Sequence, residues 1–342
     1  MEPSRKIIYV TGATASYFPM VCGLLASLRA FDPGIKLHVC DLGLTREQAA
    51  FLNRLGLLLP KPDHLESGRH AYYYKGSLAH YVAHLNFDAL VWIDSDCVVA
   101  KPLSGEVVKI LQGVGVDEPF LATTSDINGL SIGGFIKQNA GITAPFQEGI
   151  KKGGINPNYP YLNSGVFILH APKALQAWAE LVGEIPEHLL FEQNAYNLAV
   201  YQHVKRIGQL DWTTWSVCGS LLNQLTLQKG ADDLPFHIYL GDQRVFVVHI
   251  ASTREQAALD FDPIALPVAD RYVVGLYRYL RNETIQKTYL EQLYRYLAID
   301  PENRRHLLET GAALDKNPMD PNLSDQERKR LEEELAIYFK YG

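Results

Sequence analysis

The sequence lacks any apolar run long enough for a membrane-spanning helix, which needs about 20 residues. Its first residues also lack the long apolar stretch of a secretory signal peptide. Residues 1–6 are mostly polar and lead directly into a short apolar segment. We therefore expect a protein without a transmembrane segment that works in the cytoplasm.

Positive charge is scarce as well. The 32 Lys and Arg residues are outnumbered by 38 Asp and Glu residues, which gives a net charge of −6. Proteins that bind nucleic acids neutralise phosphates with a basic surface, so this composition argues against a nucleic-acid partner. A phosphorylated ligand would have to be held by local groups or through a metal ion.

Cysteine is rare and unpaired in the sequence. The four cysteines form no C-x-x-C motif and lie in apolar surroundings, at Cys22, Cys40, Cys97 and Cys218. We interpret them as small buried hydrophobic side chains in a reducing compartment. With 342 residues, 47% of them hydrophobic, the chain can bury a core without disulfides or structural metals.

Apolar segments with the composition of buried strands alternate with segments of helical periodicity. The spacing predicts strands at residues 7–10, 36–40, 57–59, 89–93, 165–169 and 245–250. It predicts helices at 21–31, 45–55, 77–85 and 191–201. This alternation is typical of an α/β fold with a mixed, mostly parallel sheet flanked by helices.

Two regions depart from this pattern. Residues 126–160 are rich in Gly, Asn and Pro, which predicts a long loop acting as a lid. From about residue 254 the composition changes, so we divide the chain into an α/β domain at 1–255 and a helical C-terminal extension at 256–342. Helices are expected there at 271–298 and 324–340. The tyrosine- and arginine-rich stretch 271–299 fits a helix on a membrane surface or one that packs on the domain.

The strongest chemical signal is a pair of acids at the end of an apolar strand. Asp94 and Asp96 follow residues 89–93, and side chains two apart in an extended chain point the same way. Ligands bind at this edge of α/β sheets, and two carboxylates there favour Mg²⁺ or Mn²⁺. A second D-x-D, Asp260 and Asp262, has no strong strand before it and predicts a surface loop.

Further motifs surround this pair in a fixed order. They are V-T-G-A with Tyr17 at residues 10–17, Y-K-G-S-L-A-H-Y at 74–81, N-S-G-V at 163–166 and F-E-Q-N-A-Y-N at 191–197. Together they resemble the GT-A glycosyltransferases, most closely the retaining family 8, which includes glycogenin and bacterial galactosyltransferases. The resemblance covers roughly residues 6–250.

The resemblance implies a metal-dependent hexosyltransferase that moves a sugar from a nucleotide-diphospho sugar, here a UDP-sugar, with retention. The acceptor would be a carbohydrate, a lipid-linked sugar or a protein, and the enzyme could form oligomers. The implied Mn²⁺ or Mg²⁺ ligands are Asp94, Asp96 and His249. The implied donor contacts are Thr11, Tyr17, Lys75, Asp94 and Asn163. The implied catalytic residues are Glu192, Gln193 and Asp126.

Within this scheme Thr11 and Tyr17 contact the base, and Lys75 pairs with phosphate. Glu192 attacks the anomeric carbon or stabilises its positive charge, whereas Gln193 can only stabilise. Each side chain also fits a structural role, such as core packing for Tyr17 or helix capping for Glu192.

The sequence departs from the family at two places. Glu192 stands where the family has Asp, and Ser252 stands where its H-x-x-G motif has Gly. The family's nearby phosphate-binding Lys has no counterpart, and Arg254 is the substitute we expect. Two other functions therefore stay open: a sugar-nucleotide-binding protein without turnover, and a nucleotidyltransferase. The latter should carry a Gly-rich basic loop after its first strand, whereas residues 11–19 have one Gly and no Lys or Arg.

Overall fold

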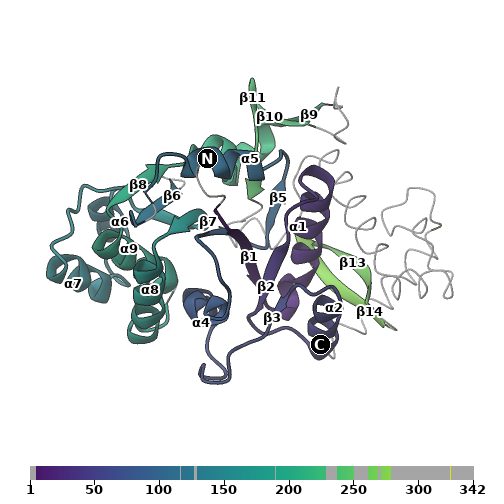
Figure 1. Ribbon diagram of the computed structural model, residues 1–342, viewed down its shortest axis with the longest axis horizontal. Helices are drawn as coiled ribbons and strands as arrows, with labels where there is room; N and C mark the ends of the chain where they lie inside the picture. The colour runs from purple at the N-terminus through teal and green to yellow at the C-terminus, as the bar shows by residue number, and fades with distance from the viewer. Residues whose placement is uncertain are drawn as a thin grey trace.

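A computed structural model describes residues 5–115, 117–126, 129–188, 190–228, 237–249, 261–268 and 271–278, together with Ser324. A seven-stranded sheet with the order β3-β2-β1-β4-β7-β6-β8 forms its centre (Figure 1). These strands are β1 (Ile7–Ala13), β2 (Leu37–Asp41), β3 (Leu58–Leu59), β4 (Ala89–Ile93), β6 (Phe120–Ser125), β7 (Leu162–His170) and β8 (Arg206–Gln209). β7 runs antiparallel to β4 and β6, and the other pairings are parallel. The predicted mixed, mostly parallel sheet is confirmed.

Helices cover both faces of this sheet. They are α1 (Phe18–Phe31), α2 (Arg46–Arg54), α3 (Ala71–Gly76), α4 (Leu78–Val82), α5 (Ser104–Leu111), α6 (Ile132–Gln138), α7 (Ala144–Lys152), α8 (Pro172–Glu184), α9 (Phe191–His203) and α10 (Trp212–Trp215). Short 3₁₀ helices occupy Ala15–Tyr17 and Gly219–Gln224. α2 begins with a capping box, in which the side chains of Thr45 and Gln48 each accept a hydrogen bond from the other's backbone N–H group.

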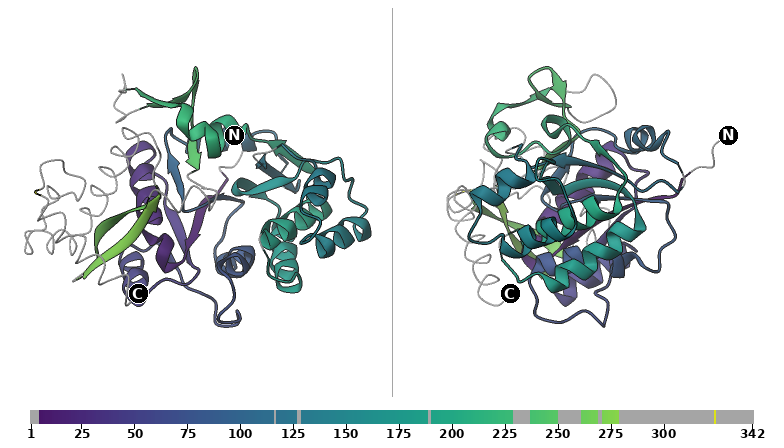
Figure 2. Two further views of the ribbon diagram at one scale, coloured as in Figure 1. Left: turned by 180° about the vertical axis from the view of Figure 1, so that it is seen from behind. Right: turned by 90° about the vertical axis from the view of Figure 1, so that its left-hand side faces the viewer.

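Alternating side chains of each strand supply two separate cores. In β4, Val91 and Ile93 pack with α1 on one face, whereas Leu90 and Trp92 pack with α8 and α9 on the other. Figures 1 and 2 show these helices on opposite sides of the sheet. Because both faces are buried, β4 is apolar at every position, and this made it recognisable in the sequence.

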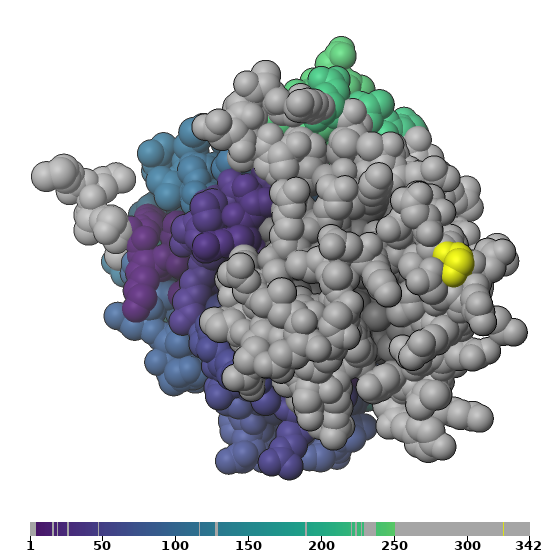
Figure 3. All heavy atoms as spheres, turned by 90° about the vertical axis from the view of Figure 1, so that its right-hand side faces the viewer, coloured from purple at the N-terminus to yellow at the C-terminus, as the bar shows by residue number. Residues whose placement is uncertain are grey.

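Smaller sheets complete the described part of the chain. β5 (Cys97–Val99) pairs antiparallel with β12 (Val247–His249), directly beyond the end of β4. β9 (Leu225–Gln228), β10 (His237–Leu240) and β11 (Gln243–Arg244) form an antiparallel sheet that projects at one end of the molecule (green in Figures 1 and 3). Among the described residues, no helix has the length and apolarity to cross a membrane.

Two sequence predictions are wrong where the structure describes the chain. The expected lid loop at 126–160 contains α6 and α7, whose Ile132, Phe135, Phe146 and Ile150 side chains are buried. The helix expected from residue 271 is instead a strand, β14 (Arg271–Arg278), paired antiparallel with β13 (Phe261–Val268). Asp262 therefore lies in a strand and not in the predicted loop. Asp260, Arg254 and the expected helical residues 279–298 and 325–340 lie outside the described residues.

Candidate active site

The chain topology brings four strand ends to one edge of the sheet. Asp94 follows β4, Asp126 follows β6, and Thr11 lies near the end of β1. β7 runs in the opposite direction, so its first residues, which include Asn163, reach the same edge. Backbone hydrogen bonds hold the register there: Asp94 N–H donates to Gly165 O (2.8 Å), and Asp126 N–H donates to Tyr161 O (2.9 Å). The side chains singled out in the sequence therefore meet.

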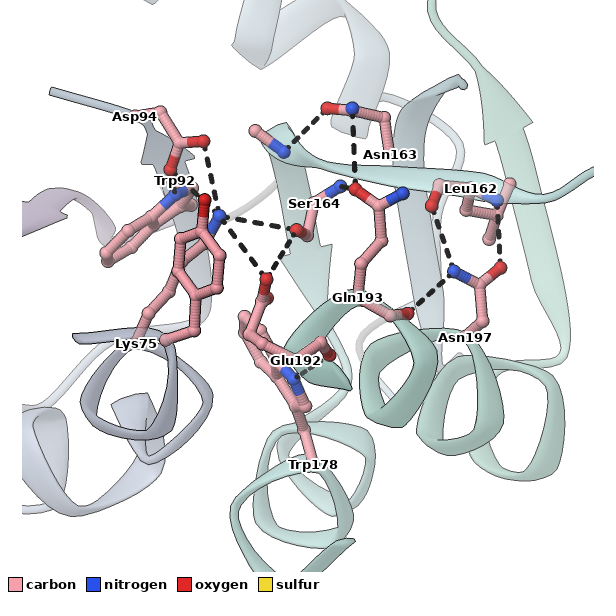
Figure 4. A network of polar contacts seen from close by, with 12 residues as sticks. Lys75, Trp92, Asp94, Leu162, Asn163, Ser164, Trp178, Glu192, Gln193 and Asn197 are labelled. Atoms are coloured by element: carbon pink, nitrogen blue, oxygen red, sulfur yellow. Dashed lines mark hydrogen bonds and ion pairs between the residues drawn. The ribbon is translucent and has the colours of Figure 1, made fainter. Parts of the chain in front are cut away.

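Lys75 is the centre of one group, which we call the lysine half and which comprises Lys75, Asp94, Ser164 and Glu192 (Figure 4). The Lys75 ammonium lies 2.9 Å from Asp94 Oδ1 and 3.9 Å from Glu192 Oε2. It also donates to Ser164 Oγ at 3.3 Å, and that hydroxyl donates to Glu192 Oε2 at 3.2 Å. A buried cation thus joins two carboxylates that come from different elements, and Ser164 links it to one of them.

Burial and charge shift the pKa values in this half. Burial alone would lower the pKa of Lys75, but the Asp94 and Glu192 carboxylates outweigh it and raise that pKa. Burial raises the pKa of Glu192 to about 7, against the opposing attraction of Lys75. Lys75 therefore stays charged, while Glu192 exchanges its proton near neutral pH. A carboxyl group with such a pKa is suited to proton transfer or to sensing charge nearby.

Surrounding backbone and indole groups fix these side chains. Trp92 Nε1 donates to Asp94 Oδ1 at 2.7 Å, and Trp178 Nε1 donates to the backbone carbonyl of Glu192 at 3.1 Å. Asn197 exchanges two hydrogen bonds with the backbone of Leu162, which ties α9 to β7 (Figure 4). The glutamate therefore lies in the first turn of a helix that hydrogen bonds tie to β7 and to α8.

The remaining predicted catalytic residues, Gln193 and Asp126, form a hydrogen-bonded chain with the predicted donor contact Asn163 beside the lysine half, which we call the amide chain. Asn163 Oδ1 accepts from Gly165 N–H (2.7 Å), and Asn163 Nδ2 contacts Gln193 Oε1 at 3.5 Å. Gln193 Nε2 in turn donates to Asp126 Oδ2 at 3.3 Å. Asp126, Asn163 and Gln193 thus lie together as the sequence motifs predicted, and Glu192 is next to them on α9.

A second group, the histidine half, comprises Asp96, Cys97, Ser216 and His249. His249 Nε2 lies 3.3 Å from Asp96 Oδ1 and 3.9 Å from Asp94 Oδ2. Ser216 Oγ contacts the other ring nitrogen, Nδ1, at 3.0 Å. Burial opposes charge on both partners, yet their mutual attraction raises the pKa of His249 and lowers that of Asp96.

The donor atoms of the histidine half fit a divalent metal ion. Asp96, Cys97 and His249 place one ligand atom each within 4.8 Å of one another. Ser216 at Nδ1 leaves Nε2 directed toward the two aspartates, which is how outer-shell partners orient a metal-binding histidine. Carboxylate and imidazole donors suit Mn²⁺ and related ions. Asp94 reaches toward both halves and is the residue they share.

Gly165 allows the two halves to approach each other. A Cβ at this position would lie 2.6 Å from His249 Cε1, 2.8 Å from Asn163 Oδ1 and 3.1 Å from Asp94 Oδ2. Distances below about 3 Å do not occur for real Cβ contacts. The glycine of the N-S-G-V motif is therefore required by space.

The predicted base contacts lie at the next strand. Thr11 is fully buried, and its hydroxyl has no hydrogen-bond partner in the structure. Tyr17, in the turn after β1, is 38% exposed. An unsatisfied buried hydroxyl is costly, and a ligand that bonds it would relieve that cost.

Sequence reasoning missed Trp92, Ser164, Ser216 and Tyr72. Ser164 could have been found, because it lies inside the N-S-G-V motif. Tyr72 is 39% exposed; burial of its hydroxyl raises the pKa of that group to about 12, against the opposing attraction of Lys75. Tyr72 lies one turn before Lys75 on α3, and this spacing is only a weak sequence indication that the two side chains share a site.

Comparison with known proteins places the fold. No protein-family model matches the sequence, and no curated protein matches it. The glycosyltransferase WbbM superposes with a TM-score of 0.50 at 15% identity, over 90% of this chain and 52% of WbbM. The galactosyltransferase LgtC gives 0.49 at 15% identity, over 87% of this chain and 99% of LgtC. GlyE of Streptococcus pneumoniae TIGR4 gives 0.46 at 13% identity, over 90% and 64%.

The chain has the GT-A glycosyltransferase fold. The sequence prediction of this fold is thereby confirmed, with strand β7 reversed within the otherwise parallel centre of the sheet. At these identities the similarity concerns the fold, and the function must be argued from the site itself.

Proposed function

We propose that the protein is a metal-dependent glycosyltransferase that transfers a sugar from a UDP-sugar with retention at the anomeric carbon. One observation carries the proposal. A buried cation held by two carboxylates lies beside an acid–imidazole pair that Asp94 links to it, on a GT-A fold. The Lys75 ammonium and a metal ion at the acid–imidazole pair would provide two neighbouring positive charges. A diphosphate carries negative charge on two adjacent phosphate groups and therefore suits this arrangement.

The histidine half would hold the metal. Asp96 and His249 would bind it directly, and Asp94 would bind it or bridge to the ribose. A divalent ion there, Mn²⁺ or Mg²⁺, supplies Lewis-acid neutralisation of the departing diphosphate. Lys75 would pair with the same phosphates as a second, permanent positive charge, and Thr11 and Tyr17 would hold the base.

The lysine half and the amide chain would hold the sugar. Asp126, Asn163 and Gln193 offer acceptors and donors for its hydroxyl groups. Glu192 would lie by the anomeric carbon, where an ionised carboxylate stabilises oxocarbenium-like charge or attacks it. Its link through Ser164 to Lys75 couples its ionisation to the charge of the bound diphosphate, because both act on the same ammonium.

A direct test combines binding with product analysis. Mn²⁺ with a panel of nucleotide sugars should raise the melting temperature most for a UDP-sugar, and slow hydrolysis of that donor should follow. NMR of the product should show the donor's α linkage kept. An inverted product would refute retention, and binding without hydrolysis would favour the sugar-nucleotide-binding alternative.

The metal requirement has its own variant. Asp96→Asn should abolish donor binding and turnover together, because the diphosphate loses its cation. Asp242→Asn, an exposed aspartate in the turn before β11, is the matched control and should behave as wild type. Equal losses of donor binding and turnover in both variants would contradict the proposed metal site.

A further inference from the structure

Cys97 lies in the histidine half, although its sequence context suggested only a buried hydrophobic residue. Its sulfur is within 4.8 Å of the Asp96 and His249 ligand atoms, and the residue is 1% exposed. The sequence motif provides a D-x-D pair, but nothing in the motif requires sulfur at the next position. The neighbouring β5 residues, Val98 and Val99, are apolar and buried.

Strand pairing explains why the sulfur reaches the imidazole. In the β5–β12 ribbon, Cys97 is the direct cross-strand partner of His249. Side chains that are directly opposite in an antiparallel pair lie on the same face, with Cβ atoms about 5 Å apart. This register places the Cβ atoms of Cys97 and His249 next to each other, and their side chains bring the sulfur and the ring nitrogen within 4.8 Å. Asp96 precedes the strand and turns its carboxylate toward the same ring at 3.3 Å.

We propose that Cys97 is a third protein ligand of the metal, so that the site is an Asp–His–Cys site selective for thiophilic divalent ions. The inference rests on the proposed metal site and narrows it. A thiolate ligand disfavours Mg²⁺, which prefers oxygen, and favours Zn²⁺ and Co²⁺ over Mn²⁺. On binding, the S–H bond breaks, a sulfur–metal bond forms, and the proton leaves to solvent.

Co²⁺ alone is the probe, because its visible bands report binding and a near-ultraviolet charge-transfer band reports a thiolate ligand. The wild-type protein should show both sets of bands. Cys97→Ala should lose the near-ultraviolet band and release one proton fewer per Co²⁺ bound. Its Co²⁺ affinity should fall at least tenfold, while its weak Mg²⁺ affinity should change little.

Two controls address folding and the other thiols. Cys22→Ala removes an equally buried free thiol and should keep the full spectrum. Cys218→Ala removes the thiol that acts electrostatically on Cys97, and it should also keep the band. Circular dichroism without metal checks that each variant folds. Cys97→Ser replaces the alanine variant if the latter does not fold.

The outcomes separate this inference from the proposed function. Visible bands without the near-ultraviolet band, in the wild-type protein, would overturn Cys97 as a ligand and leave the metal-dependent transferase standing. A near-ultraviolet band that persists in Cys97→Ala but vanishes in Cys218→Ala would also overturn it. Absence of both bands would overturn the inference together with the metal dependence of the proposed activity.

Discussion

The two halves of the site solve the same electrostatic problem differently. In the lysine half, Asp94 and Glu192 share the built-in cation of Lys75. In the histidine half, Asp96 has His249, which is neutral or charged depending on its proton, and the described residues place no lysine or arginine in ion-pair contact with it. The lysine half therefore carries the permanent charge of Lys75, whereas the metal ion proposed for the histidine half can be exchanged. We expect the first to govern stability and the second to govern ligand dependence.

The largest expected effect on stability comes from removing the cation of the lysine half. Lys75→Met leaves the Asp94 and Glu192 carboxylates without their shared ammonium, and removing one partner of a buried ion pair costs about 4 kcal/mol. Urea unfolding should show this loss. The double variant Lys75→Met/Glu192→Gln should recover a large part of it, because one of the two stranded charges is then gone.

Lys109 offers the control for that experiment. Its side chain is 68% exposed and pairs with Glu106 on the same helix, so Lys109→Met should cost well under about 1 kcal/mol. If both lysine variants lose the same stability, the buried network is not what holds the lysine half together.

The second prediction concerns pH in the lysine half. Burial raises the pKa of Glu192 from 4.5 to about 7, so the folded protein disfavours the ionised form. No cost exists below about pH 4.5. The cost grows as pH rises and is complete above about pH 7, where it reaches roughly 3 kcal/mol. Stability of the wild type relative to Glu192→Gln should therefore fall across this interval.

Unfolding of both proteins between pH 4.5 and 8 measures that difference. Because the two chains share every other titrating group, their difference isolates Glu192. A difference that does not change with pH would mean that the carboxyl group is ionised throughout, and Lys75 would then outweigh burial.

The third prediction acts where the two halves meet. Gly165→Ala forces apart His249, Asn163 and Asp94, and a displacement of about 1 Å in an active site can cost about 100-fold in turnover. Metal affinity should fall as well. Gly141→Ala, at an exposed position where an added Cβ meets nothing within 4 Å, should be silent. If Gly165→Ala lowers turnover and leaves metal affinity intact, the two halves are less coupled than their distances suggest.

The parts of this site that the sequence predicted are those defined by local pattern. A strand that is apolar on both faces and is followed by Asp94 and Asp96 predicts a ligand-binding sheet edge, and this prediction needs no tertiary structure. The N-S-G-V and F-E-Q-N motifs likewise marked the segments that meet Asp94 across the sheet edge.

The contacts that sequence reasoning missed join segments far apart in the chain. The Ser216–His249 bond and the Cys97–His249 pairing depend on how β12 returns to β5. Local pattern also misled at residues 271–278, where R-Y-V-V-G-L-Y-R was interpreted as part of a helix. Its β-branched and aromatic residues are typical of a strand, and antiparallel pairing with β13 stabilises the strand β14 over the expected helix.

The smallest expected effect concerns Thr11, which lies in neither half. Thr11→Val keeps the shape of the side chain and removes a buried hydroxyl that has no partner in the structure. Most threonine variants lose stability with the hydrogen bond, but here none is lost, so unfolding should be unchanged or shifted to higher stability by about 1 kcal/mol. If the hydroxyl exists to bind the base, UDP affinity measured by calorimetry should fall by about 5- to 10-fold, the worth of one hydrogen bond. Thr11→Val should therefore lower the UDP affinity while the free energy of unfolding stays the same or increases. Loss of stability together with unchanged UDP affinity would place this hydroxyl in the fold and remove it from the donor site.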